Sequence, residues 1–155
     1  VDFAFVDARL VQSRQQLMTA IVQAIVGAMR RDPKRPDAEV GLKTPSIHSD
    51  LLWTLHSNNN IAEALRRFGV SRTTRTLILV RVAPPLDAGE LVQHMTQLVD
   101  GTLQTRGLSL PSPALAWSEL GTAYKIQDTP AFQHLDTSQV DALICSMVAS
   151  KYVGA

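Results

Sequence analysis

The sequence has few of the residues that build covalent or metal-bound frameworks. Among its 155 residues Cys145 is the single cysteine, which excludes an internal disulfide and a cysteine-rich zinc site. One free thiol fits a reducing compartment, so we expect no disulfide partner. The four histidines are scattered and have no pairing at the helical spacing of metal ligands. We therefore expect neither a metal nor another cofactor.

Long apolar runs are also missing. No stretch approaches the roughly 20 apolar residues that span a bilayer, so we expect no membrane partner. Apolar residues still make up 45% of the chain, which is enough for a packed core and excludes general disorder. The length predicts a single domain over residues 1–155. The chain begins Val1-Asp2 without methionine or a signal-like segment, so we expect an amino terminus that is cut short.

Positive charge is scarce in the second half of the chain. Residues 1–81 hold twelve Lys and Arg against seven Asp and Glu, whereas residues 82–155 hold three against seven. This asymmetry fits one basic and one acidic face, or two halves whose charges intermix in space.

The apolar residues follow patterns typical of both helices and strands. The apolar run at 76–82 predicts a strand that is buried on both faces. The irregular interleaving of elements favours an α/β domain of the α+β type, in which helices cover a small sheet. We expect strands at 1–6, 76–82 and 101–103, and helices at 13–31, 46–55, 87–99 and 137–152, with further helix starts at Ser112-Pro113 and Thr129-Pro130.

Recognisable catalytic motifs are absent from the sequence. It contains no phosphate-binding glycine loop, nucleophile elbow or zinc-protease helix. His48-Ser49-Asp50 has the residue types of a catalytic triad, but neighbours on a helix point in different directions. A helix cap and solvent-facing polar residues explain these three better. Cys145 lies in an apolar helix and is expected to be buried, so we predict no catalytic residue.

The segment 57–70 is unusually well specified. Asn60 and Glu63 predict a capping box, and Gly69 predicts a left-handed residue just beyond the helix, with Val70 against Leu65. The two turns between these caps are far shorter than the roughly 12–15 residues of an autonomous helix. Packing must therefore stabilise the helix, and periodicity leaves open whether any of its apolar side chains remain exposed to a partner.

Two polar features accompany this helix. Asn58-Asn59-Asn60 offers more amides than a cap requires, either to contact a ligand or RNA or because asparagine tolerates turns. Four arginines, Arg66, Arg67, Arg72 and Arg75, follow with no acid between them. They suit contacts with phosphates, or they form an ordinary solvated helix end.

These features together resemble a known family. The resemblance rests on residues 43–44, 48–50, 58–70 and 77–82, with further matches at 7–8, 13, 20, 124–126 and 142–145. The chain resembles the PRPK-binding subunit family, the small subunits of the KEOPS/EKC complex. Pro45, the loop at 33–36 and the connector at 108–113 depart from the family pattern.

The resemblance implies a fold and a function. The fold is a small mixed, largely antiparallel sheet flanked by helices. The function is that of a non-catalytic subunit, cytoplasmic and nuclear, that binds the small atypical kinase/ATPase subunit. It also helps recruit tRNA by the 3′ CCA tail for threonylcarbamoyladenosine modification. We expect kinase contacts from Ile61, Leu65, Phe68, Val70, Leu143, Met147 and Val148, and tRNA contacts from Lys43, Asn59, Asn60, Arg66, Arg67, Arg72 and Arg75.

Two other functions stay open on the sequence. One is a regulatory α/β domain that binds a small molecule in a pocket under the short helix. The other is a weak hydrolase that uses one of the histidines.

Overall fold

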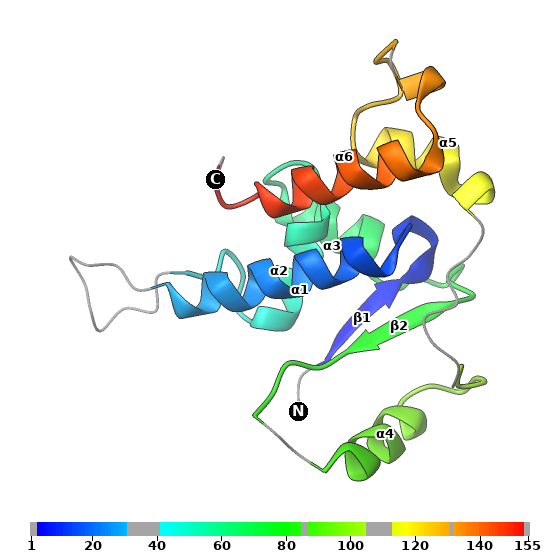
Figure 1. Cartoon of the computed structure of the whole chain (residues 1–155). Helices are drawn as coiled ribbons and strands as arrows, with labels where there is room; N and C mark the ends of the chain where they lie inside the picture. The colour runs from blue at the N-terminus through cyan, green and yellow to red at the C-terminus, as the bar shows by residue number, and fades with distance from the viewer. Residues whose placement is uncertain (1–2, 31–40, 85–86, 105–112, 131, 154–155) are drawn as a thin grey trace.

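The computed structural model describes residues 3–30, 41–84, 87–104, 113–130 and 132–153. Within these ranges a small sheet is accompanied by helices from both halves of the chain (Figure 1). The elements are β1 (Ala4–Asp7), the 3₁₀ helix η1 (Ala8–Leu10), α1 (Arg14–Met29), α2 (Ile47–Leu55), α3 (Ile61–Phe68), β2 (Leu77–Val80), α4 (Ala88–Gln97), α5 (Pro113–Ala123), the 3₁₀ helix η2 (Phe132–His134) and α6 (Thr137–Ala149). A small mixed α/β domain is therefore confirmed.

The sheet is a single antiparallel pair in the described part of the chain. β1 and β2 pair with Ala4 opposite Val80 and Asp7 opposite Leu77. On its other side Val6 makes an isolated bridge to Gly69, just beyond α3. The expected burial of β2 on both faces is wrong, because only Val80 is fully buried. A sheet of two strands is only marginally stable by itself in water, so it needs further contacts such as the bridge between Val6 and Gly69.

The helices begin where their capping residues predict. Ser13 accepts from the Gln16 amide at the start of α1. Ser46 closes a capping box with Ser49, and Asp136 closes another with Gln139 at the start of α6. These bonds satisfy backbone amides that have no partner within the helix.

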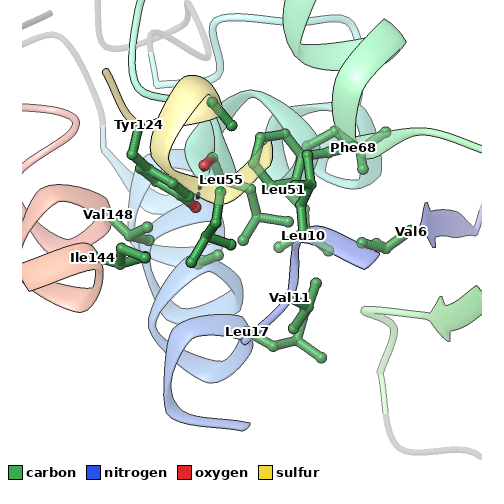
Figure 2. Packing of buried hydrophobic residues seen from close by; sticks show 14 of the residues in the cluster. Val6, Leu10, Val11, Leu17, Leu51, Leu55, Phe68, Tyr124, Ile144 and Val148 are labelled. Carbon is green, nitrogen blue, oxygen red and sulfur yellow. Dashed lines mark hydrogen bonds between the residues drawn. The ribbon is translucent and has the colours of Figure 1, made fainter. Parts of the chain in front are cut away.

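The core lies between α1, α2 and α6, close to β1. α1 packs against both other helices. Tyr124 connects three elements at its centre: its hydroxyl donates to the Leu55 carbonyl at 2.6 Å and accepts from Gln16 Nε2 at 2.8 Å. Figure 2 shows Tyr124 and Phe68 among the buried side chains of this cluster. Burial raises the pKa of Tyr124, so the phenol stays protonated and keeps donating.

One expectation for the middle of the chain needs correction, because residues 101–103 form no strand. The helix expected at 87–99 is present as α4. It has no fully buried residue and lies apart from the other helices (Figure 1). Among the described residues no helix is both long and apolar enough to cross a membrane.

Candidate functional site

The start of α3 is fixed by a set of amide side chains. The Asn60 side chain accepts from the Glu63 amide at 3.0 Å. Asn58 accepts from the Asn60 amide at 2.9 Å and donates to the Glu63 carboxylate at 3.1 Å. The same carboxylate accepts from Arg67 Nε at 2.9 Å. The predicted capping box is therefore only half formed, because Glu63 binds Asn58 and Arg67 instead of the backbone amide of Asn60.

These bonds set the charge state of Glu63. Hydrogen bonds from Asn58 and then Arg67 lower the pKa of Glu63 to about 2. The carboxylate is thus ionised throughout the physiological range and holds the Asn58 side chain in place.

The end of α3 differs from the prediction. Gly69 donates to the Leu65 carbonyl at 3.0 Å but has φ −76° and ψ 164°, so it is extended and not left-handed. Glycine is needed at position 69 because there is no room for a side chain. A Cβ at Gly69 would lie 2.3 Å from the Leu65 carbonyl oxygen.

The expected kinase-facing residues divide into exposed and buried sets. Phe68 and Val148 are 0% and 1% exposed, so they belong to the core and present no surface in this conformation. Met147 is partly buried against the core. The candidate surface therefore consists of the exposed apolar side chains Ile61, Leu65, Val70 and Leu143.

The turn before α3 meets the end of α6. A shallow depression of about 330 Å³, open to solvent, lies between the two segments. It is lined by Ser57, Asn58, Asn59, Met147, Ser150 and Lys151. Asn59 and Met147, which sequence analysis assigned to different partners, thus border the same depression.

The expected tRNA-binding residues are spread along α3. Asn59 and Asn60 lie before its first turn, and Arg66 lies near its end, with Arg72 and Arg75 in the segment that follows. Arg67 is already paired with Glu63. Within the described ranges no carboxylate pairs with Lys43, Arg66, Arg72 or Arg75, and all four are exposed. Their charges are therefore available to an anionic partner.

The triad-like residues carry structural bonds. Asp50 accepts from the backbone amides of Lys43 and Thr44 and from the Tyr152 hydroxyl. His48 Nε2 accepts from the Val82 amide at 3.0 Å. The expectation that these residues face solvent is wrong, because both side chains are buried. Their polar groups support the loop before α2 and the end of β2.

Cys145 is buried as expected. Burial raises the pKa of its thiol to about 11, which keeps it protonated and unreactive near neutrality. Among the described residues no group of three or more His, Cys, Asp or Glu is arranged to hold a metal ion.

Sequence reasoning missed a buried polar group at this site. Lys151 is 7% exposed and its ammonium donates to the carbonyls of His56 and Asn58, above the Trp53 ring. His56 is 2% exposed and its Nδ1 accepts from the Asn58 amide. A lysine after an amphipathic helix is expected at the surface, and nothing in the linear sequence links it to residues 56–58.

A second exposed apolar surface lies on α1. Its outer face presents Met18, Val22, Val26 and Met29, which are 39–74% exposed. No charged residue occurs between Arg14 and Arg30. This outer face of α1 is the rival to the α3 surface as a partner-binding site.

Comparison of the sequence with known proteins shows which family this chain belongs to. The family model described as "Kinase binding protein CGI-121" matches residues 1–152. The chain belongs to this family. A Gibberella zeae protein described as "EKC/KEOPS complex subunit CGI121" is 36% identical over 107 residues, which cover 64% of this chain and 50% of the relative.

A second relative aligns over nearly the whole chain. The Cryptococcus neoformans protein of the same description is 30% identical over 179 aligned positions, covering 99% of this chain and 77% of the relative. The chain thus spans about half the length of the Gibberella relative and about three quarters of the Cryptococcus one. The resemblance to the small subunits of the KEOPS/EKC complex is confirmed at the level of the family.

Proposed function

We propose that this chain is a non-catalytic subunit of an EKC/KEOPS complex that binds the small kinase/ATPase subunit of the complex. One observation carries the proposal: Ile61 and Leu65 stay exposed on a helix whose neighbouring apolar side chains, Ala64 and Phe68, are fully buried and hold it against the core. Apolar side chains on a fixed helix suit the centre of an interface, and Arg66 at their edge suits its rim.

The exposed apolar residues come from two segments. Leu143 is on α6, one turn before Met147, and Met147 borders the same depression as the turn that precedes α3. A partner that covers the depression would therefore contact the end of α6 and the turn that leads into α3. The family description, a kinase binding protein, agrees with a kinase as this partner.

Amide hydrogen exchange with the kinase subunit tests this placement. We expect slower exchange at residues 61–70 and 143–147 in the complex, and unchanged exchange at 18–29 on α1. Protection confined to α1 would move the interface to the rival surface. Absence of any binding would reject the kinase proposal itself.

The second part of the proposal concerns tRNA. We infer that Lys43, Asn59, Arg66, Arg72 and Arg75 contribute to binding tRNA through its single-stranded 3′ CCA tail. Two observations support it: no carboxylate in the described part of the chain pairs with the four basic side chains, and Asn59 is exposed. Tails of this kind are bound by phosphate contacts and by stacking, and the charge supplies the phosphate contacts.

Full-length tRNA and tRNA lacking its CCA end separate tail recognition from general charge attraction. We expect the shortened tRNA to bind at least ten-fold more weakly at the same salt concentration. Equal affinities would reject tail recognition while leaving the kinase proposal untouched. Nuclear and cytoplasmic residence, where tRNA is made and used, belongs to the same proposal.

The small-molecule alternative gains no support from the depression. Ligand pockets bury most of the ligand surface, whereas this depression is shallow and open to solvent.

A further inference from the structure

We infer that Lys151 is a positioning residue, which fixes the Asn58–Asn60 turn against the end of α6 so that both present one continuous binding surface. That Lys151 holds the turn is a claim about the free chain alone. That the held turn serves binding rests on the proposed function.

The ammonium of Lys151 lies where two separate carbonyls converge. It donates to the His56 carbonyl at 2.6 Å and to the Asn58 carbonyl, and it lies 4.5 Å from the centroid of the Trp53 ring. His56 is the C-cap of α2, so this carbonyl lies at the helix end, where carbonyls lack an intrahelical partner and a cation is favourable. Lys151 thus caps α2 from the far end of the chain.

The turn above this ammonium is held at every residue except one. Ser57 donates to the Ala123 carbonyl at 2.7 Å, and the Asn58 amide donates to His56 Nδ1 at 3.2 Å. Asn60 caps α3. Asn59 is exposed and borders the depression with Met147 and Ser150. The backbone at Asn59 is therefore held in place by the bonds of its neighbours, and the bond from Lys151 comes from the other side of the depression.

Burying the ammonium of Lys151 to hold two segments together costs free energy. Burial lowers the pKa of Lys151 to about 8, which shows that the folded chain disfavours the charge. An apolar side chain would avoid this cost, but it has no donor for the two carbonyls. A lysine at this position is explained if the turn must be held in one place, because its ammonium can bind both carbonyls at once.

The test compares Lys151→Met, which keeps the length of the side chain, with Lys151→Gln, which keeps one donating group. Lys125→Met is the matched control, because Lys125 is exposed on the surface. In the free full chain we expect amide exchange at Asn58 and Asn60 to be at least ten-fold faster in Lys151→Met and less accelerated in Lys151→Gln. Core amides such as that of Tyr124 should exchange as before, and Lys125→Met should match the parent chain throughout.

Binding then connects the turn to function. With full-length tRNA as the probe, which the proposed function places against Asn59, we expect Lys151→Met to lose at least five-fold in affinity and Lys125→Met to lose none. Unchanged exchange at Asn58 and Asn60 would overturn the inference. So would acceleration of all core amides alike, which marks a general structural role. If Lys151→Met does not fold, the exchange pattern of Lys151→Gln decides in the same way. If the parent chain does not bind tRNA, the tRNA part of the proposed function fails, and the exchange data alone test the role of Lys151.

Discussion

The two exposed apolar surfaces, on α3 and on α1, differ in what surrounds them. α3 has eight residues, and charged side chains, Glu63 and Arg67, alternate with its exposed Ile61 and Leu65. α1 has sixteen residues and carries no charge from Gln15 to Met29. α3 is also held by buried polar groups at the end of α2 and after α6, His56 and Lys151.

The comparison teaches that exposed apolar area does not by itself identify a specific interface. Specific interfaces combine an apolar centre with arginine and other polar groups at defined positions. On α3 the Glu63–Arg67 ion pair lies within the helix itself, whereas on α1 the arginines, Arg14 and Arg30, lie at the ends of the apolar face. The α1 surface offers as many exposed apolar side chains, four, but no charged residue among them that would select one partner over another.

The largest expected effect lies beneath the α3 surface. Phe68→Ala should lower the free energy of unfolding by about 3–5 kcal/mol, because it removes a fully buried ring next to His56 and Tyr124. Val26→Ala, on the exposed face of α1, should cost less than about 1 kcal/mol. Urea denaturation of both variants measures the difference. Equal losses would contradict the distinction between the two surfaces.

The end of α3 should be sensitive to a single methyl group. Gly69→Ala places a Cβ against the Leu65 carbonyl oxygen, so we expect a loss of about 1–3 kcal/mol in the free energy of unfolding. Gly101→Ala is the control, since its nearest neighbour would be an ordinary 3.6 Å from the new Cβ. A stable Gly69→Ala chain would show that the segment after α3 moves freely.

Stability above neutral pH should depend on Lys151. Its folded-state pKa of about 8 lies below the unfolded value of 10.5, so the unfolded chain binds the extra proton and raising the pH through this window favours folding. Two titratable groups near it, His56 and Glu63, keep one charge state in this window, because burial lowers the pKa of His56 and hydrogen bonds from Asn58 and Arg67 lower that of Glu63 to about 2.

Thermal melts of the parent chain and Lys151→Met between pH 7 and 10 measure this contribution. The stability of the parent should rise relative to Lys151→Met, with a slope of at most about 1.4 kcal/mol per pH unit. Comparing the two chains cancels the opposite effect of Cys145, whose raised pKa lowers stability above pH 9. Parallel curves would mean that Lys151 titrates as it does in water.

The smallest expected effect concerns the arginines after α3. Charge reversal at Arg72 and Arg75 should weaken tRNA binding and flatten its salt dependence, because each lost phosphate contact lowers the slope of log K against log salt by about 0.7–0.9. Arg14→Glu at the start of α1 is the matched control. An unchanged slope in the double variant would exclude these arginines from the contact with tRNA.

Local signals in the sequence predicted the helix boundaries well. Ser13, Ser46, Asn60 and Asp136 each begin a helix as predicted, because a cap depends only on residues within one turn. The strand at 77–80 was found for a similar reason, from its run of β-branched and aliphatic residues.

Burial and long-range contacts could not be predicted in the same way. Periodicity predicted α4 as a helix, but it did not show that none of its residues would be fully buried. Gly69 matched the sequence signature of a left-handed cap, yet its bridge to Val6 keeps the backbone extended. Lys151 binds carbonyls more than ninety residues earlier in the chain, and no local pattern contains such a contact.

The affinity of the kinase subunit for two matched variants tests the central claim most directly. Leu65→Glu and Val22→Glu each place a carboxylate at an exposed apolar helix position, on α3 and on α1 respectively. With both variants shown to fold by circular dichroism, we predict that Leu65→Glu loses at least ten-fold in affinity by calorimetry and Val22→Glu loses less than two-fold. Full affinity of Leu65→Glu together with a loss in Val22→Glu would contradict the account and place the interface on α1.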